Sequence, residues 1–232
     1  MIKVRPAGER GKTRTSWLHS SHTFSFNRYC DPAWSGFGSL LVINEDFVAP
    51  SQGFGRHSHE NMEILSYVVE GALEHRDSSG GSGVIRPNEL QRMSAGTGIS
   101  HSESNPSSTR PVHFLQIWIL PERNGLAPEY EQREFPASER SGRLRLIASR
   151  DGRDVSVVIH QDANVYDAVL GPGGEVVHRP VAGRRTWIQV IRGSLSTNGT
   201  GLETGDGAAI IEETSINIKA ERESEMLLFD LG

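Results

Sequence analysis

The sequence has little cysteine, no long apolar run and no excess of positive charge. Its 232 residues include one cysteine, Cys30, which excludes an intrachain disulfide and leaves a metal site to histidine and carboxylate ligands. The net charge is −5, without a basic stretch, which argues against direct binding of nucleic acid. No run of about 18 apolar residues occurs and the first residues are polar, so we expect a soluble, cytoplasmic protein without membrane contact.

Turn-forming residues are frequent, with 25 glycines and 11 prolines. Between the turns lie short runs in which apolar residues alternate with polar ones, a pattern typical of strands. These runs are residues 39–44, 63–69, 112–119, 144–148, 186–191 and 226–231. They predict an all-β sandwich or barrel. A helical stretch is expected only around residues 128–133, inside a polar segment that separates two strand-rich halves.

A weak internal repeat relates the two halves. The block that begins at Tyr67 (YVVEGAL) recurs at Gln189 (QVIRGSL), an offset of 122 residues, and each block predicts a strand, a glycine turn and a returning strand. We therefore expect two copies of one barrel, at residues 1–125 and 143–232, joined by a linker at 126–142. Two unrelated hairpins that share a glycine remain the alternative.

Two short motifs in the first half are composed of metal-ligand residue types. His57 and His59 are two residues apart, as are His101 and Glu103, so in a strand each pair points to one face, with about 6–7 Å between its members. If the two strands are neighbours, three imidazoles and one carboxylate converge on a metal site. Glu63 is the rival fourth ligand, but a straight strand would place it about 13 Å from His59.

The second half lacks both pairs. The 122-residue offset places Arg179 and Val181 at the positions of the first histidine pair, and aligning the later turn shifts the offset to 118 and places Lys219 and Glu221 opposite the second pair. A lysine ammonium does not bind a divalent metal. We therefore predict that the C-terminal barrel holds no metal.

The whole chain resembles the pirin family of bicupins, in particular its bacterial quercetin-degrading branch. The resemblance rests on several motifs and on the two ligand pairs. The motifs are HTFSF at 22–26, GFG at 36–38 and 53–55, MEI at 62–64, LEHRDS at 73–78 and MSAGTGI at 93–99.

The resemblance implies two tandem cupin barrels with one metal, held in the N-terminal barrel by the residues that match His57, His59, His101 and Glu103. It also implies quercetin 2,3-dioxygenase activity, in which a flavonol takes up O2, its central ring opens and carbon monoxide leaves. We expect one divalent transition metal per chain, with iron the first choice and copper, manganese, cobalt, nickel or zinc as alternatives.

In this hypothesis the metal acts as a Lewis acid on the flavonol 3-hydroxyl, and Glu103 takes the hydroxyl proton as general base. A flat flavonol or related polyphenol needs an apolar slot with a few polar positioners. The candidates are Phe37, Phe54, Met62 and Met93, with His22, His75 and Glu63 as polar groups. We expect a monomer, and we expect His113 and His160 to be structural.

Two other classes of function compete with the enzyme. Eukaryotic members of the pirin family are regarded as transcriptional co-regulators, so a metal-bound regulatory module without a catalytic role is the main alternative. A cupin isomerase or a small-ligand sensor is a weaker one, since the fold does not choose among these functions.

Overall fold

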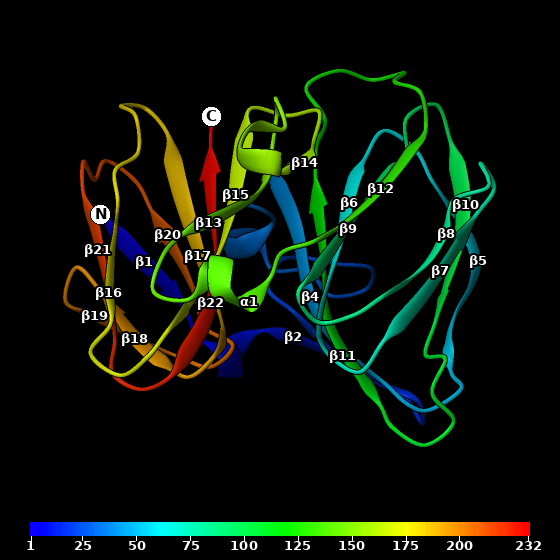
Figure 1. Cartoon of the computed structure of the whole chain (residues 1–232), viewed down its shortest axis with the longest axis horizontal. Coiled ribbons are helices and arrows are strands. Elements are labelled where there is room, and N and C mark those ends of the chain that lie inside the picture. Colours follow the sequence, from blue (N-terminus) through cyan, green and yellow to red (C-terminus); the bar gives the residue numbers. More distant parts are fainter. The chain divides into compact units, whose positions relative to one another are not determined.

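The computed structural model describes residues 1–232, which form two compact units. The N-terminal unit comprises Gly11–Phe135 and Ile159–Gln161, and the C-terminal unit comprises Met1–Arg10, Pro136–Val158 and Asp162–Gly232. In Figure 1 the strands of the N-terminal unit run from blue to green, and those of the C-terminal unit run from yellow-green to red, with the blue strand β1 added. Both units consist mainly of strands, which confirms the predicted all-β class.

Two sheets, of seven and four strands, form the N-terminal unit. The strand order of the larger sheet is β12-β9-β6-β11-β4-β3-β2, and that of the smaller sheet is β5-β10-β7-β8. The larger sheet contains β2 (Gly11–Arg14), β3 (Leu18–His22), β4 (Leu40–Val48), β6 (Glu63–Glu70), β9 (Glu89–Ser94), β11 (Val112–Ile119) and β12 (Glu129–Glu134). The smaller sheet contains β5 (Gly53–His59), β7 (Leu73–Asp77), β8 (Ser82–Ile85) and β10 (Ile99–Ser104).

The C-terminal unit has the same two kinds of sheet, ordered β1-β20-β17-β22-β15-β13-β14 and β16-β21-β18-β19. The larger sheet contains β1 (Ile2–Arg5), β13 (Arg145–Ser149), β14 (Val157–Val158), β15 (Ala163–Leu170), β17 (Arg185–Arg192), β20 (Gly207–Ile210) and β22 (Ser224–Leu231). The smaller sheet contains β16 (Glu175–His178), β18 (Ser194–Thr197), β19 (Thr200–Glu203) and β21 (Ile216–Ala220), and the unit's one α-helix is α1 (Ala137–Arg140). Three-residue 3-10 turns lie at Ala7–Glu9, Pro32–Trp34 and Arg153–Val155.

The strand orders of the two units correspond position by position. The central strands β6 and β17 match, as do their neighbours β11 and β22. Strands β6 and β17 contain the first residues of the repeated block detected in the sequence. This correspondence confirms that the chain holds two copies of one barrel and makes two unrelated hairpins untenable.

Strand pairing corrects the alignment expected for the ligand positions. His75 lies opposite Glu103 in the N-terminal unit. Its repeat counterpart, Thr197, lies opposite Ile218. The structural counterparts of His101 and Glu103 are therefore Ile216 and Ile218, not Lys219 and Glu221, and both isoleucines belong to the apolar core. The 118-residue offset was wrong because β9 has six residues and its counterpart β20 has four, so the segments between the aligned turn and the ligand positions differ in length.

His178 is the counterpart of His57 in the C-terminal unit. His57 lies opposite His101 on the neighbouring strand, and His178 lies opposite Ile216, the residue that takes the place of His101. One histidine position is thus retained in the second unit, whereas its partners across the strand pair are apolar.

The observed boundaries differ from the expected ones at both ends of the first barrel. Strand β1 pairs with β20 and packs Ile2 and Val4 on the C-terminal core, so residues 1–10 belong to the second unit. The segment expected to be a helical linker contains strand β12, which pairs with β9 at the edge of the sheet. Its polar composition suits an edge strand, and two of its three glutamates, Glu129 and Glu131, form ion pairs with the buried Arg92.

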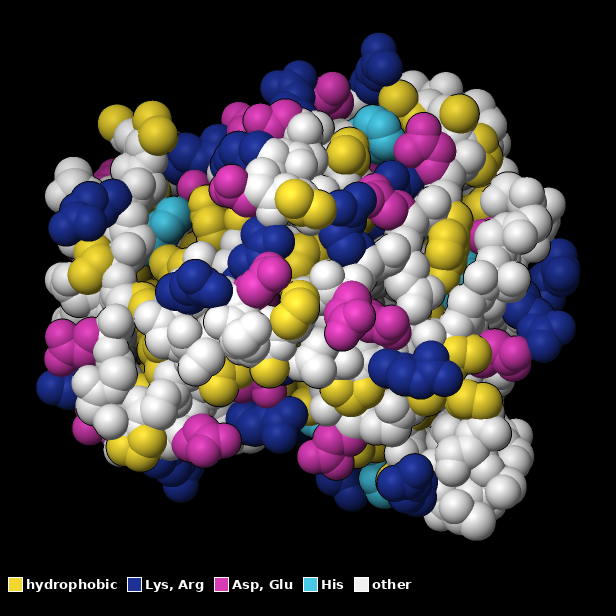
Figure 2. Space-filling model, in the orientation of Figure 1, with side chains coloured by type: hydrophobic (Ala, Val, Ile, Leu, Met, Phe, Trp, Pro, Cys, Tyr) yellow, Lys and Arg dark blue, Asp and Glu magenta, His cyan; other side chains and the backbone are white.

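No helix in the structure has the length and apolar character needed to span a bilayer. On the face drawn in Figure 2, Lys and Arg side chains are interspersed with Asp and Glu over both units, and apolar side chains are scattered. On this face, charges of neither sign gather into one large patch.

The repeated turn depends on its glycine. Gly71 and Gly193 have φ values of +83° and +92°, which side-chain-bearing residues rarely adopt. A Cβ atom at Gly193 would also overlap the backbone carbonyl oxygen of Glu223 and the hydroxyl of Ser224.

We expect Gly193→Ala to lower the free energy of unfolding by about 2 kcal/mol or more, because the left-handed backbone costs about 1–2 kcal/mol and the overlap adds to that. Gly201→Ala is the matched control, since nothing lies within 4 Å of a Cβ there, and it should change stability by less than about 0.5 kcal/mol. Urea unfolding of both variants measures the difference. Equal losses would contradict the role assigned to this turn.

Candidate metal centre

Strands β5 and β10 bring the two predicted pairs together. His101 lies directly opposite His57 in an antiparallel register. Along β10, Ile99, His101 and Glu103 are buried while the serines between them are partly exposed, as the alternation of a strand requires. The ring centroids of His57, His59 and His101 lie 4.4 to 4.9 Å from one another. The expected convergence of three imidazoles is therefore present in the structure.

A backbone carbonyl sets the orientation of the His57 ring. His57 Nδ1 lies 2.8 Å from the carbonyl oxygen of Gly55. Since a carbonyl only accepts hydrogen bonds, Nδ1 must carry the proton, and Nε2 has a free lone pair. That lone pair faces the cluster, with His57 Nε2 only 3.0 Å from His101 Nε2.

His75 and Asp77 fix the tautomer of His101 in the same way. His75 Nε2 lies 3.1 Å from Asp77 Oδ2, to which it donates, so in a neutral His75 ring the Nδ1 atom can only accept. This Nδ1 lies 3.4 Å from His101 Nδ1, which is then the donor. The Nε2 atom of His101 therefore carries no proton, and its lone pair is directed at the cluster. A carboxylate behind a histidine is the usual support of a metal ligand.

The electrostatics of the cluster favour neutral imidazoles. Burial, followed by the neighbouring histidines, lowers the pKa of His101 to about 3. Burial and His57 lower the pKa of His59 to about 4, and His59 Nε2 is buried without a hydrogen-bond partner. Two nitrogens bound to one ion at about 2.1 Å and at a right angle lie about 3.0 Å apart, which is the separation of the two Nε2 atoms. The donor set therefore fits a transition metal.

Glu103 adjoins the cluster on the side of His75. Its carboxylate accepts hydrogen bonds from Ser66 Oγ at 3.1 Å and from Gln116 Nε2 at 2.9 and 3.0 Å. The ligand atoms of His75, His101 and Glu103 lie within 4.8 Å of one another. The ligand atoms of His57, His59 and His101 form a second group within the same distance. His101 belongs to both groups. A bulge between His101 and Glu103 interrupts their register with β5.

Glu63, the rival fourth ligand, lies outside both groups. It is buried and accepts a hydrogen bond from Ser94 Oγ at 2.9 Å and one from the backbone N–H of His160 at 3.3 Å. The His160 ring also lies 3.4 Å from the same carboxylate. The contact explains why His160, far along the sequence, belongs to the N-terminal unit.

A cavity of about 270 Å³ opens beside the histidines, and we call it the histidine cavity. Its lining includes His57 and His59, three aromatic rings and several polar side chains. The aromatic residues are Phe26, Phe54 and Trp118, and the polar ones include His22, Asn44, Asp46 and Gln116. Of the predicted pocket residues, Phe54 and His22 line it.

The other predicted pocket residues lie elsewhere. Met93 is fully buried in a small apolar cluster, and Met62 packs against that cluster. Phe37 forms a bridge with Leu40, and His75 lies behind His101. None of the four lines the histidine cavity. The prediction was wrong at the two methionines because their side chains contribute to the packing of the barrel interior.

Polar residues inside apolar strands are the site residues that the sequence analysis missed. Gln116 lies within the apolar run of β11, opposite Ser66 on one side and Asn44 on the other. Asn44 and Asp46 occupy buried, same-face positions of β4. Inward-facing polar residues in otherwise apolar strands are costly unless they have partners, and that pattern was the available signal.

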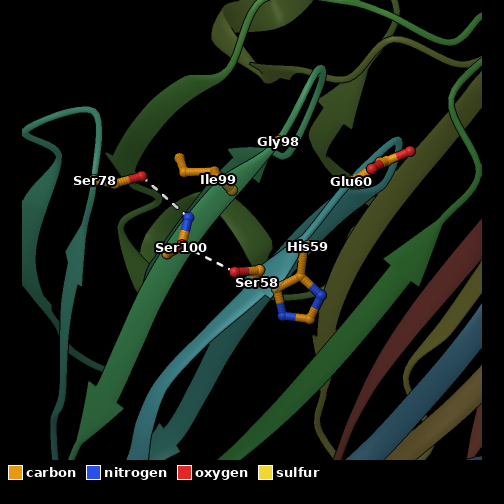
Figure 3. Close-up of a pocket in the computed structure, with 7 residues that line it drawn as sticks. All are labelled: Ser58, His59, Glu60, Ser78, Gly98, Ile99 and Ser100. Carbon is orange, nitrogen blue, oxygen red and sulfur yellow. Dashed lines mark hydrogen bonds between the residues drawn. The ribbon is translucent and has the colours of Figure 1, made fainter.

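A second hollow, of about 410 Å³, lies at the ends of β5 and β10 (Figure 3). Its serine side chains bond to the surrounding strands: Ser58 Oγ lies 2.9 Å from Ser100 Oγ, and the Ser100 N–H donates to Ser78 Oγ at 3.1 Å. In Figure 3 the His59 ring stands at the side of these serines without a hydrogen bond to them. The histidine cavity has three buried polar atoms without a hydrogen-bond partner in its lining, at Asp46, His59 and Trp118, whereas this hollow shares only that of His59. The histidine cavity is therefore the candidate site.

Comparison with known proteins identifies the family. A profile of the pirin family matches residues 3–119, half of the chain. The chain belongs to the pirin family. A second profile, the quercetinase C-terminal cupin domain, matches residues 146–231 of this pirin. The two matches confirm the two-cupin architecture and the predicted family.

The relatives of this pirin include a protein of Escherichia coli K12 named quercetin 2,3-dioxygenase, which is 50% identical over 231 residues and covers 100% of this chain and 99% of the relative. The crystal structure of E. coli YhhW has a TM-score of 0.97 at 50% identity and covers 100% of this chain and 98% of that one. A structure of the bacterial pirin YhhW in complex with nickel(II) has a TM-score of 0.95 at 50% identity, with coverage of 100% and 99%.

Asp46 is a buried carboxyl group in the wall of the histidine cavity. Its Oδ1 atom has no hydrogen-bond partner. Burial is the main cause that raises its pKa from 3.8 to about 7; the Ser20 hydrogen bond opposes the shift, and Glu103 and Glu45 add to it. This pirin therefore holds a carboxyl group that is partly protonated near neutral pH.

Replacing Asp46 with asparagine tests this protonation. Since the folded-state pKa is raised, the folded protein binds an extra proton between pH 3.8 and about 7, and wild-type stability is lost as the pH rises through that window. In metal-free protein, Asp46→Asn should gain stability relative to wild type from pH 4 to 8, by on the order of 4 kcal/mol at 1.36 kcal/mol per pKa unit.

Urea unfolding at several pH values measures this difference. Glu70→Gln, an exposed carboxylate of the same unit, is the control and should show no such trend. A stability difference between Asp46→Asn and wild type that stays constant with pH would contradict the assignment.

Proposed function

We propose that this chain is a metal-dependent quercetin 2,3-dioxygenase, which cleaves the central ring of a flavonol with O2 and releases carbon monoxide. The observation that carries the proposal is the convergence of three histidines beside an aromatic-lined cavity, with the Nε2 atoms of His57 and His101 only 3.0 Å apart. The name and 50% identity of the E. coli relative support the choice of reaction.

The residues proposed to hold the metal are His57, His59 and His101, with Glu103 as the fourth ligand. When bound, the ion supplies a Lewis acid that lowers the pKa of the flavonol hydroxyl. Three neutral imidazoles and one carboxylate leave a divalent site with a net charge of +1, which favours an anionic substrate oxygen. We propose one metal per chain, because the counterparts of His101 and Glu103 in the second unit are Ile216 and Ile218.

Glu103 is proposed to accept the hydroxyl proton of the substrate. Ser66 and Gln116 hold its carboxylate by three hydrogen bonds and orient it toward His101. Gln116 lines the cavity itself, so it links the carboxylate to the space where a substrate would bind. A positioned carboxylate of this kind is a competent general base.

The cavity walls are proposed to orient the flat ring system. Trp118 lies 4.9 Å from His59 and 5.5 Å from Phe26, in both cases edge-to-face. Phe54 packs edge-to-face on Trp17 at the other side. These rings offer apolar contact, while the buried Nε1 of Trp118 has no partner and could donate to a substrate oxygen.

The finer properties of the protein stay predictions. Imidazole ligands suit iron, nickel, copper, cobalt, manganese and zinc, and iron remains our first choice for the native metal. The nickel(II) complex of the E. coli pirin supports the inclusion of nickel in any reconstitution. A cytoplasmic location, a monomeric state and the absence of nucleic-acid and membrane contacts belong to the same group of predictions.

Reconstitution with each of these metals tests the function. The loaded wild-type protein should consume quercetin and O2 and release carbon monoxide, followed by flavonol absorbance, an oxygen electrode and gas analysis. His101→Ala and Glu103→Ala should abolish turnover and lower metal affinity by more than about 100-fold, the upper end for outer-shell residues. His178→Ala, the counterpart of His57, should leave both unchanged.

Two outcomes would count against the proposal. Equal metal loss in all three variants would contradict the single site. Full metal loading without turnover for any of the metals would contradict the reaction and favour a metal-bound regulatory module of the pirin type.

A further inference from the structure

A cavity of about 400 Å³ lies in the C-terminal unit, and we call it the arginine pocket. It is formed by residues of β15 and β22, by the loop before β14 and by the loop between β16 and β17. Its lining includes four arginines, at 150, 153, 179 and 184, together with Tyr166 and the buried Asp230.

The arginine pocket occupies the position of the histidine cavity in the second copy of the barrel. Asn44 of the histidine cavity lies opposite Gln116, and by strand correspondence the equivalent pair in the C-terminal unit is Tyr166 and Leu228. In the same alignment Trp118 corresponds to Asp230. The second barrel thus has a cavity at the equivalent position, but isoleucines replace the residues equivalent to His101 and Glu103.

The acidic groups of the arginine pocket are already paired. Asp230 lies 2.6 Å from Arg184 Nε and 3.5 Å from His178 Nε2. Arg184 also bonds to Asp162 Oδ1 at 2.8 Å. The remaining carboxylate, at position 151, lies 2.9 Å from an arginine of the same loop. The three aspartates thus pair with two of the four arginines, at 153 and 184, and the four arginines of the lining exceed its aspartates by one charge.

Arg179 is a cation of the lining that forms none of these ion pairs. It is exposed at the pocket wall, next to His178, and makes no hydrogen bond or ion pair. Arginine presents a planar fork of donors that matches a carboxylate. The positive excess of the pocket therefore favours an anion.

Apolar surface adjoins these charges. The Tyr166 ring is half-buried and lies 5.6 Å from the His178 ring. Val181, in the same lining, is 73% exposed although it is apolar. A ligand that covers the ring and the valine while it meets Arg179 must combine an anionic group with an apolar body.

We propose that the arginine pocket is a second ligand site that binds a small aromatic carboxylate, independently of the metal centre. Arg179 contacts the carboxylate, and Tyr166 with Val181 contacts the ring. The metal-binding histidines play no part, so the site functions whether or not the proposed dioxygenase activity is correct.

Calorimetric titration of the metal-loaded, full-length protein with benzoate tests this site. Inorganic phosphate and benzamide serve as the other probes, since the first lacks the ring and the second lacks the charge. Benzoate should saturate one site, with at least tenfold weaker binding of both other probes. Arg179→Ala should weaken benzoate binding at least tenfold, and Arg179→Lys should restore part of the loss.

Arg185→Ala is the matched control, because Arg185 is exposed in the same unit and lies outside the pocket. It should bind benzoate as wild type does. Absence of benzoate binding, or unchanged binding in Arg179→Ala, would overturn the proposal. Equal affinity for phosphate or benzamide would overturn the assignment of an aromatic carboxylate, and equal losses in the two alanine variants would indicate general charge screening instead of a site.

Discussion

The direction of the imidazole lone pairs is the constraint on which the site depends. The Gly55 carbonyl accepts a hydrogen bond from His57 Nδ1, and His75, held by Asp77, accepts one from His101 Nδ1, so the two unprotonated Nε2 atoms lie 3.0 Å apart. Buried polar atoms without partners cost about 1–3 kcal/mol each. A bound cation relieves that cost, so the fold holds in its barrel wall a group of donors that is complete only with an ion.

The second barrel lacks the paired imidazoles, and its strands are apolar at the corresponding positions. Ile216 and Ile218 replace a histidine and a glutamate and join the apolar core, so the unit no longer carries the desolvation cost of the ligand set. His178 persists, but the residue opposite it is Ile216 and its Nε2 lies 3.5 Å from Asp230, so no second imidazole faces it across the strand pair. The two copies of one fold thus separate into a unit with metal-site chemistry and a unit with a charged pocket, consistent with the rule that function belongs to sites and not to folds.

Much of the fold and the histidine cluster could be predicted from the sequence, because both follow from periodicity. Strand alternation places His57 and His59 on one face of β5, and the register that sets His101 opposite His57 adds the third imidazole. The pocket residues could not be predicted in the same way. Gln116, Asn44 and Asp46 become neighbours only through the pairing of distant strands, and the bulge beside Glu103 depends on tertiary packing. The linker was misplaced because an edge strand such as β12 and a polar linker have the same composition, and residues 1–10 were misplaced because only the pairing of β1 with the distant β20 puts them in the second unit.

X-ray absorption spectroscopy of the metal-reconstituted protein tests the central claim most directly. The account predicts a single metal environment with three imidazole ligands, whose nitrogen count falls by one in His101→Ala. A fit with fewer than three imidazoles in the wild-type protein, or a spectrum unchanged in His101→Ala, would contradict it.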